Sequence, residues 1–197
     1  MFTPTDIVVV TGSNGHLAQH TVDQLLSLPH GPRVRGTVRT EETKKMILQH
    51  YRSVDGGEKS GRLEVYVVKD MLAEGAFDEV VRGATHIAHV ASPLVITAIT
   101  DVSKQLLDPA IQGTVGILKS AKKSGSVRAV VITSSFGAVF DPKMGWRKGH
   151  NYTSADWNPA TYEGAADPNL NLMAYPVELR HYVTYCASKV LAEKAAW

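Results

Sequence analysis

A tyrosine and a lysine stand four residues apart near the end of the chain, as Tyr185 and Lys189. On an α-helix two such residues share a face, so the lysine ammonium can lie near the phenol. A nearby cation favours the phenolate, which makes Tyr185 a candidate proton donor and acceptor near neutral pH. Ser135 ends the β-rich run 130–135, and its hydroxyl is suited to hold and polarise a carbonyl oxygen. Together the three residues predict acid–base chemistry at a carbonyl group.

A glycine-rich turn near the amino terminus predicts a dinucleotide site. It follows an apolar strand predicted at residues 7–10 and opens an amphipathic helix predicted at residues 17–28. Gly12 permits a tight strand-to-helix turn, and Gly15 lets the backbone approach phosphate groups with no Cβ in the way. The amide groups and the dipole at the helix N-terminus favour an anion. The predicted pyrophosphate cradle comprises Gly12, Ser13, Asn14, Gly15, His16 and Leu17.

The end of the second predicted strand indicates which nicotinamide cofactor the chain binds. An acidic residue there would bind the ribose 2′-hydroxyl of NAD, whereas this chain has Arg39. A guanidinium binds a phosphate with two parallel hydrogen bonds, so NADP(H) is favoured over NAD(H). Lys44, or Lys45 beside it, is a second candidate for the 2′-phosphate. The alternative is a solvated arginine followed by two exposed lysines.

Further candidates for cofactor contacts follow the next two predicted strands. Asp70 ends the third strand, where its carboxylate is suited to the adenine amino group, and Met71 would add a backbone contact. Ala91 and Ser92 follow the fourth strand, at the carboxyl edge where open α/β sheets bind ligands. Ordinary strand-ending turns are the alternative at both places. We predict no metal site.

Short β-rich runs alternate with longer helical patterns, which is typical of a parallel sheet joined by helical crossovers and predicts the α/β class. The run 7–10 is apolar throughout, as a strand covered on both faces requires. A polar connection with four prolines is predicted at 137–179, as a functional or disordered loop, and a short loop at 55–61. The other predicted strands are 34–38, 63–68, 87–90 and 127–132, and the other helices are 41–51, 77–81, 103–123 (with Pro109 near its start or at a kink) and 177–197.

The composition is that of an ordinary globular protein, with 44% hydrophobic residues, 20% charged residues and a net charge of +2 over 197 residues. This balance gives no basic field that would indicate nucleic acid or an anionic membrane as a partner. No run approaches the ~20 apolar residues of a membrane span, and nothing resembles a secretory signal. We therefore expect a cytoplasmic protein whose single cysteine, Cys186, is buried in the last helix rather than reactive.

These motifs, in this order, resemble an extended short-chain dehydrogenase/reductase, closest to the dihydroflavonol 4-reductases, cinnamoyl-CoA reductases and fungal NADPH-dependent aldehyde and methylglyoxal reductases. The resemblance implies a Rossmann-like doubly wound parallel sheet and NADPH-dependent reduction of an aldehyde or ketone. Tyr185 would donate the proton, Lys189 would also bind the nicotinamide ribose, and Ser135 would position the carbonyl, with Ser134 as the fallback. The matching stretches are residues 11–20, 36–39, 89–93, 109–114, 131–135 and 185–197.

The resemblance ends where family members continue into further strands and a C-terminal substrate domain. We expect residues 1–197 to form one NAD(P)-binding domain that is truncated before the C-terminal substrate domain, with an unpaired edge on the fifth strand. Such a chain would be marginally stable, would self-associate through this edge, or would be a piece of a longer product. The segment 141–176 is longer than the usual family loop, and Trp146, Trp157 and Tyr162 in it are candidates to line a pocket.

Two other functional interpretations stay open. The first is a non-catalytic or truncated NADP(H)-binding module, although a pure sensor has no need of Ser135, Tyr185 and Lys189. The second is another enzyme with the same tyrosine–lysine core, either an NAD(P)-dependent epimerase or dehydratase, or a hydroxysteroid dehydrogenase. Neither the substrate nor the stereochemistry is predicted.

Overall fold

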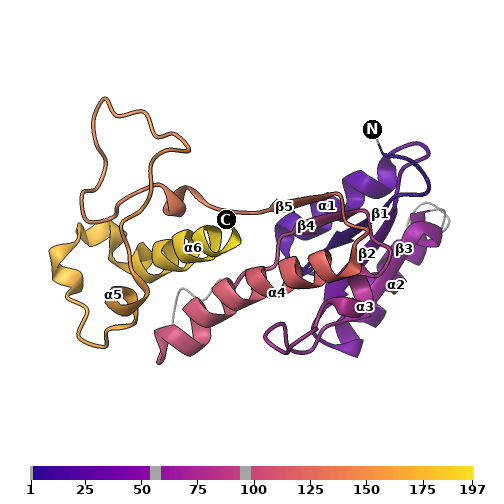
Figure 1. The fold of residues 1–197 in the computed structure, drawn as a ribbon, viewed down its shortest axis with the longest axis horizontal. Coiled ribbons are helices and arrows are strands. Elements are labelled where there is room, and N and C mark those ends of the chain that lie inside the picture. Colours follow the sequence, from indigo (N-terminus) through magenta and orange to yellow (C-terminus); the bar gives the residue numbers. More distant parts are fainter. Residues whose placement is uncertain (1, 54–58, 94–98) are drawn as a thin grey trace. The chain divides into compact units, whose positions relative to one another are not determined.

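The computed structural model describes residues 2–53, 59–93 and 99–197, which divide into two compact units (Figure 1). The sheet unit comprises Met1–Ala91 and Gly116–Thr133. The helical unit comprises Ser92–Val115 and Ser134–Trp197. Within the described residues, every helix is too short or too polar to span a bilayer.

A five-stranded parallel sheet in the order β3-β2-β1-β4-β5 forms the sheet unit. Strand β1 (Ile7–Val10) pairs with both β2 (Arg33–Val38) and β4 (His86–His89), so the strand order reverses at β1. The carboxyl ends of β1 and β4 therefore mark the topological switch point, where open α/β sheets bind ligands. The parallel α/β fold is confirmed, and the predicted strands differ from the observed ones by no more than two residues at either end.

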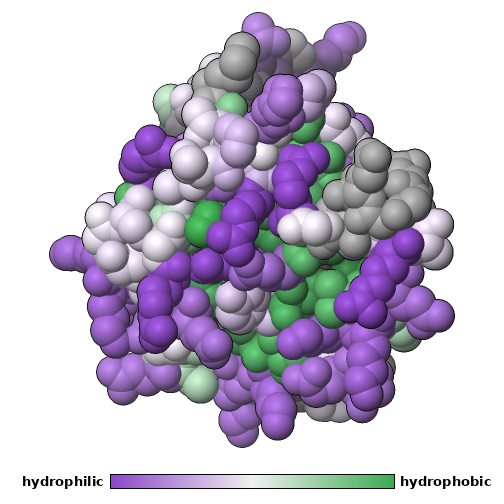
Figure 2. All heavy atoms as spheres, turned by 90° about the vertical axis from the view of Figure 1, so that its right-hand side faces the viewer, coloured by the Kyte–Doolittle hydropathy of each residue, from purple (hydrophilic) through white to green (hydrophobic). Residues whose placement is uncertain are grey.

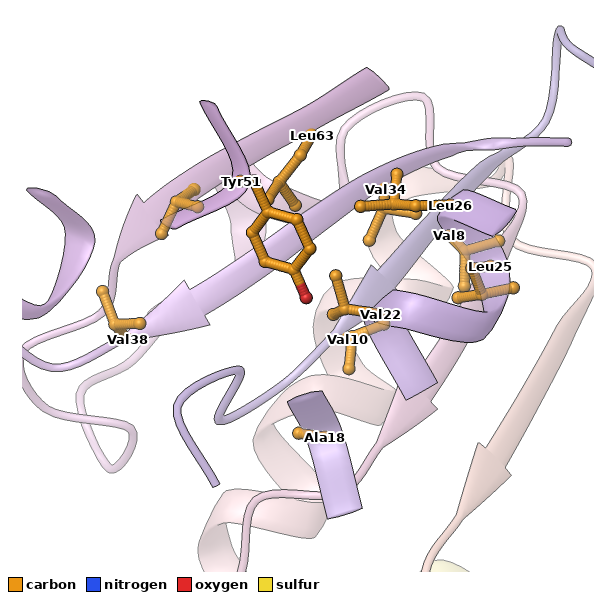
Figure 3. Packing of buried hydrophobic residues seen from close by; sticks show 11 residues of the cluster. Val8, Val10, Ala18, Val22, Leu25, Leu26, Val34, Val38, Tyr51 and Leu63 are labelled. Carbon is orange, nitrogen blue, oxygen red and sulfur yellow. The ribbon is translucent and has the colours of Figure 1, made fainter. Parts of the chain in front are cut away.

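One face of the sheet packs against the first two helices. Val8 and Val10 of β1 point to this face, where they meet the apolar stripe of α1 (His16–Ser27) and Tyr51 of α2 (Glu41–Ser53), as Figure 3 shows. The stripe recurs every three or four residues, as a helix that covers a core requires. Its buried members are Ala18, Val22, Leu25 and Leu26.

The opposite face of the sheet carries a second core. Val9, between the two valines above, points to this face because successive side chains of a strand alternate. It packs with α3 (Asp78–Val81) and with the sheet-unit end of α4 (Asp108–Ser124), whose Ile117 is fully buried. Helices on both faces make the sheet doubly wound, which confirms the predicted arrangement and explains why β1 is apolar throughout.

Strand β5 (Ala129–Ile132) lies at an edge of the sheet, as predicted. Val131 of this strand is 67% exposed, and the strand pairs in parallel with β4. An unpaired edge of this kind offers a row of amide and carbonyl groups to another strand. The self-association that we expect there stays a prediction.

The surface of the sheet unit is mixed in polarity. Figure 2 looks onto this unit from the right-hand side of Figure 1 and shows hydrophilic side chains surrounding hydrophobic ones. Between β2 and β3 (Leu63–Val67), Glu64 forms ion pairs with Arg33 and, at 3.2 Å, with Arg35. Because the Arg33 side chain is exposed, its pair with Glu64 contributes little to stability, whereas the Arg35 side chain is only 13% exposed.

The main helix of the helical unit is α6 (Val183–Ala196). A 3-10 turn at Val177–Tyr182 precedes it, so the α-helix begins six residues later than predicted. Pro176 is extended, with φ −50° and ψ 137°, and its carbonyl accepts from Leu179 N at 2.9 Å. The tighter i to i+3 bond at this proline therefore replaces the first α-helical turn.

The helix predicted at 103–123 is divided at its start. A π-helical turn at Ser103–Leu107 precedes α4, in which Pro109 is the second residue. The π turn runs directly into α4, since Asp108 N donates to Ser103 O, so Pro109 does not stand at a free helix start. Its missing amide hydrogen instead falls beside the wider π turn, where the α-helical hydrogen-bond pattern is already interrupted. Pro109 thus lies at the junction of the two helical segments.

The predicted structureless connection at 137–179 contains local structure, so that expectation is wrong. It includes a short helix, α5 (Tyr162–Ala166), and 3-10 turns at Phe136–Ala138 and Leu172–Ala174. Each begins at a side-chain cap, as when Thr161 Oγ1 accepts from Gly164 N at 3.1 Å. Of the loop predicted at 55–61, residues 55–58 lie outside the described residues, and Lys59–Arg62 forms a 3-10 helix.

Candidate active site

The glycine-rich turn follows β1 in a conformation that only glycine adopts readily. Gly12 has a φ of +67° and donates its amide to Thr37 Oγ1 at 3.1 Å. Ser13 N donates to the carbonyl of Thr37 at 2.8 Å, and Ser13 Oγ donates to Val10 O at 3.0 Å. The buried Thr37, in β2, thus holds the turn through two of its own atoms. This support was missed, because nothing in the local pattern marks Thr37.

The turn packs closely against the ends of the neighbouring strands. A Cβ built on Gly12 would lie 3.1 Å from the Cβ of Ala91, and one on Gly36 would lie 2.4 Å from Ser13 Oγ. The sheet unit therefore brings Ala91 beside Gly12, at the switch point between β1 and β4. The other candidate residues of the sheet unit follow the carboxyl ends of β1, β2 and β3 along the chain.

The start of α1 fits a dinucleotide pyrophosphate. Gly15 is its N-cap, and a Cβ there would lie 3.1 Å from the carbonyl oxygen of Gly12. The first turn has no acidic side chain that would repel an anion. His16, Leu17 and Asn14 are exposed, and the His16 ring meets the His20 ring edge to face at 5.0 Å. The residues present therefore suit the phosphates of a nicotinamide dinucleotide.

The candidates for the adenosine half lie on three different segments of the sheet unit. Arg39 follows β2 and is exposed, whereas Lys44 is half-buried in α2. Asp70 Oδ1 accepts from Leu72 N at 2.9 Å, so one carboxylate oxygen closes the turn after β3. The side chain of Met71 packs against the second core. Arg39 thus has a side chain available to a phosphate, while Asp70 has a local structural role as well.

The remaining candidates belong to the helical unit. Ser92 is exposed at its start. Ser135 caps the 3-10 turn Phe136–Ala138, where its Oγ accepts from Gly137 N at 3.1 Å. Tyr185 and Lys189 both lie in α6, so the predicted one-turn spacing on a continuous helix is observed.

The Ser135 turn packs directly on α6. A Cβ built on Gly137 would lie 3.0 Å from the sulfur of Cys186 and 3.2 Å from its Cα, and Cys186 is the neighbour of Tyr185. Ser134 Oγ also donates to the carboxylate of Glu193, one turn beyond Lys189. The helical unit therefore brings together the two elements that carry Ser135, Tyr185 and Lys189.

A buried asparagine, which the sequence did not single out, fixes this turn. Asn158 is 2% exposed and donates its side-chain amide to the carbonyl of Gly137 at 3.0 Å. Its backbone amide donates to the carbonyl of Ala138 at 2.8 Å, and its Oδ1 accepts from Ala160 N at 2.9 Å. Asn158 thus anchors the middle of the connection 137–179 to the turn that begins at Ser135.

Lys189 is an unusually enclosed cation, with 8% of its surface exposed. Burial lowers the pKa of its ammonium below the ordinary value of 10.5, and the nearby carboxylate of Glu193 raises it in part compensation. Tyr185, one turn earlier, is half-buried. The cation therefore acts on its surroundings with little screening by water.

Cys186 is buried, as predicted, and burial raises the pKa of its thiol to about 11. A thiol of this kind stays protonated near neutral pH, so it is a poor nucleophile. The residue serves instead as a contact between α6 and the Ser135 turn.

The three aromatic residues proposed to line one pocket have separate partners. Trp146 stacks on Phe136 at 5.9 Å between ring centroids, Trp157 lies under Lys194, and Tyr162 donates its hydroxyl to Asp108 at 2.9 Å. A pocket of about 240 Å³ in the same unit is lined by other residues, including Asn158, Tyr175, Val183 and Ala187. On α6, Val183 and Ala187 lie on the side opposite Tyr185.

Comparison with known proteins decides the family. Residues 9–162 match the profile of the 3-beta hydroxysteroid dehydrogenase/isomerase family. The chain belongs to this family. Its relatives also confirm the predicted resemblance: this family member is an extended short-chain dehydrogenase/reductase related to the aldehyde, methylglyoxal and cinnamoyl-CoA reductases.

The similarity extends along almost all of this family member. It is 41% identical over 190 residues to a putative uncharacterized oxidoreductase of Schizosaccharomyces pombe, a match that covers 96% of this chain and 52% of the relative. It is 35% identical to aldehyde reductase 2 of Sporidiobolus salmonicolor, with 97% and 51% covered. The crystal structure of yeast methylglyoxal/isovaleraldehyde reductase Gre2 complexed with NADPH has a TM-score of 0.78 and 37% identity, over 97% of this chain and 52% of that chain. The chain thus spans about half the length of the relatives it matches.

Proposed function

We propose that this family member reduces an aldehyde or ketone to the alcohol with NADPH, by means of Ser135, Tyr185 and Lys189. The observation that carries the proposal is the packing of the Ser135 turn onto the helix that holds the other two residues, with Gly137 against Cys186. Relatives named as aldehyde and methylglyoxal reductases support carbonyl reduction as the reaction class.

The proposed cofactor is NADP(H), which one relative holds in its crystal structure. In this chain the glycine turn and the start of α1 would bind the pyrophosphate, because a side chain at Gly12 or Gly15 would fill the space that the backbone leaves. Arg39 and Lys44 would bind the 2′-phosphate. The adenine and the rest of the dinucleotide would be contacted by Asp70, Met71, Ala91 and Ser92.

When bound, NADPH supplies the hydride that the carbonyl carbon accepts. Ser135 donates its hydroxyl hydrogen to the carbonyl oxygen and so fixes the orientation of the substrate. Tyr185 transfers its phenolic proton to that oxygen as the alcohol forms, and the proton is later regained from solvent.

Lys189 would act on Tyr185 and on the nicotinamide ribose. Its buried ammonium stabilises the phenolate that remains after proton transfer, because an opposite charge is strongly favoured where water is excluded. Glu193 limits the cost of burying this cation.

The family match supports a second candidate, the oxidation of a hydroxysteroid, because the matching profile is that of hydroxysteroid dehydrogenases. The same residues would then run the reaction in reverse, with Tyr185 as the base that removes the hydroxyl proton. A turnover assay with sterol alcohols and NADP distinguishes this reading from aldehyde or ketone reduction.

Substitution of Tyr185 tests the proposal. Tyr185→Phe is expected to lower kcat for aldehyde reduction by about 10²- to 10⁴-fold, the usual contribution of a general acid, and to leave the Kd for NADPH within about twofold. Turnover is followed by the loss of NADPH absorbance, and binding by nicotinamide fluorescence. Tyr182→Phe is the matched control, since Tyr182 precedes α6 and is 42% exposed.

Two results would decide against this reading. Unchanged turnover in Tyr185→Phe removes this residue from the mechanism. Tight binding of NADPH by the wild-type chain, with no reduction of a panel of aldehydes and ketones, favours a non-catalytic NADP(H)-binding module instead.

A further inference from the structure

A buried hydrogen-bond network joins the two strand ends at the switch point of the sheet unit. Thr11, directly before Gly12, is fully buried, and His89, the last residue of β4, is 3% exposed. Three polar atoms surround the hydroxyl oxygen of Thr11: the amide nitrogens of Val90 at 3.0 Å and Ala91 at 2.9 Å, and Nδ1 of His89 at 3.0 Å.

The arrangement decides which atom donates in each bond. Backbone amides only donate, so the hydroxyl oxygen of Thr11 accepts from Val90 and from Ala91, and both of its lone pairs are used. Its single hydrogen must then point to Nδ1 of His89, which accepts. An acceptor at Nδ1 means that the imidazole is neutral and carries its hydrogen on Nε2.

The opposite assignment would be costly in this place. With a hydrogen on Nδ1, the Thr11 oxygen would have to accept a third hydrogen bond. The hydroxyl hydrogen of Thr11 would then lack an acceptor among its three described partners, in a buried position. Of the three described groups bonded to the Thr11 oxygen, Nδ1 of His89 is the one that can accept.

The network controls where the glycine turn lies. Thr11 N donates to the carbonyl of Ala88 at 3.1 Å, so Thr11 is bound to β4 through both its backbone and its side chain. Ala91, which the Thr11 hydroxyl holds, is the residue that packs against Gly12. A rotation of the Thr11 hydroxyl would release the Ala91 amide and, with it, the contact that supports the turn.

We propose that His89 is a positioning residue for the dinucleotide site: by accepting from Thr11 it directs the lone pairs of Thr11 Oγ1 to the amides that hold Ala91 against the glycine turn. The proposal rests on the proposed NADP(H) function. It assigns to His89 a role in nucleotide affinity, beyond filling space next to Phe77, whose ring it meets edge to face at 6.4 Å.

Three variants separate positioning from packing. Thr11→Val keeps the shape of residue 11 and removes its hydroxyl, and His89→Leu fills much of the ring's space without an acceptor. His89→Leu is expected to raise the Kd for NADPH about tenfold, the effect of one buried hydrogen bond. Thr11→Val also removes the acceptor of the Val90 and Ala91 amides, so it should raise the Kd at least as much. The double variant should bind little more weakly than Thr11→Val, since that substitution already removes the bond to His89. His89→Asn, whose Oδ1 replaces Nδ1 as acceptor, should stay within about threefold of wild type.

His86→Leu is the matched control. It replaces the same residue type in the same strand, but at the amino end of β4, and should leave the Kd for NADPH unchanged. Nicotinamide fluorescence measures the Kd, and a thermal melt of each variant measures folding. Equal NADPH affinity in wild type and His89→Leu, with a lowered melting temperature alone, would overturn the inference and leave the proposed function intact. A wild-type chain that does not bind NADPH would overturn the proposed function and this inference with it.

Nitrogen NMR of the wild-type chain, labelled with ¹⁵N-histidine, gives an answer that does not depend on any variant folding. The long-range nitrogen–proton correlations of the His89 ring should be those of the neutral form with the hydrogen on Nε2, in the free chain near pH 7. A hydrogen on Nδ1, or a doubly protonated ring, would contradict the network on which the inference rests.

Discussion

Ser134 and Ser135 both follow strand β5, and their hydroxyl groups have different partners. Ser134 donates its hydroxyl hydrogen to the carboxylate of Glu193 in α6. The oxygen of Ser135 instead accepts from Gly137 N at 3.1 Å, which leaves its hydroxyl hydrogen to be directed at a substrate. These bonds favour Ser135 as the residue that positions the carbonyl. Ser134 instead links the end of β5 to α6 through its bond to Glu193.

Alanine substitutions at the two serines test this division. Ser135→Ala is expected to lower kcat for aldehyde reduction by about 10²-fold, the cost of losing one donor to a reacting oxygen. Ser134→Ala should keep kcat within about threefold and lower the melting temperature instead, because its bond to Glu193 is structural. Steady-state kinetics and a thermal melt of both variants check this. A larger kcat defect in Ser134→Ala than in Ser135→Ala would exchange the two roles.

Local spacing was sufficient to find some of these residues and insufficient for others. Tyr185 and Lys189 could be predicted because a four-residue spacing on one helix is a local pattern. Asn158 and Glu193 were missed because their partners lie 21 and 59 residues away in the sequence. The bond between Thr11 and His89 spans 78 residues and follows only from the pairing of β1 with β4.

At the scale of elements, the two ends of the sheet have separate tasks. The carboxyl ends of β1 and β4 carry the candidate nucleotide site, whereas the amino end of β1 carries a stabilising cluster around Asp6. This carboxylate is 4% exposed, accepts from the amide and the hydroxyl of Thr3 at 2.8 Å each, and pairs with Arg128 just before β5. Asp6 thus joins the beginnings of β1 and β5.

The stability of the sheet unit should therefore depend on pH through Asp6. The hydrogen bonds from Thr3, with further contributions from Thr85 and Arg128, lower the pKa of this carboxyl from 3.8 to about 2. Because the folded chain binds this proton more weakly than the unfolded chain, Asp6 stabilises the fold fully above about pH 4, and this contribution is lost as the pH falls to about 2.

Asp6→Asn tests the prediction. The variant should melt at a lower temperature than wild type at pH 7, and the difference should shrink between about pH 4 and pH 2. Its Kd for NADPH should not change, since Asp6 lies at the end of β1 away from the glycine turn. A constant difference in melting temperature from pH 7 to pH 2 would show that the charge of Asp6 does not contribute.

The elements themselves were largely predictable, and the exceptions have physical causes. Short β-rich runs between helical patterns located the five strands of the described sheet, and β1 is apolar throughout because helices cover the sheet on both faces. The start of α6 was misplaced because Pro176 and the turn after it favour a 3-10 conformation that periodicity alone does not distinguish. The connection at 137–179 was expected to lack structure because its short helix and turns depend on individual side-chain caps.

At the scale of the whole molecule, the chain consists of a sheet unit, which carries the glycine turn, and a helical unit, which carries the proposed catalytic residues. It spans about half the length of its curated relatives, and activity is therefore proposed for the chain rather than carried over from them. The proposed reaction requires hydride to pass from the bound dinucleotide to the carbonyl carbon of the substrate.

Transfer of labelled hydride measures this directly. The wild-type chain is incubated with an aldehyde and NADPH that carries deuterium at both positions of nicotinamide C4, and the alcohol is analysed by mass spectrometry. One deuterium is expected on the carbon that bears the hydroxyl group of the alcohol, and Tyr185→Phe is expected to form little labelled alcohol. A wild-type chain that binds NADPH, as judged by fluorescence, yet forms no labelled alcohol from any aldehyde or ketone offered would contradict the proposed reaction.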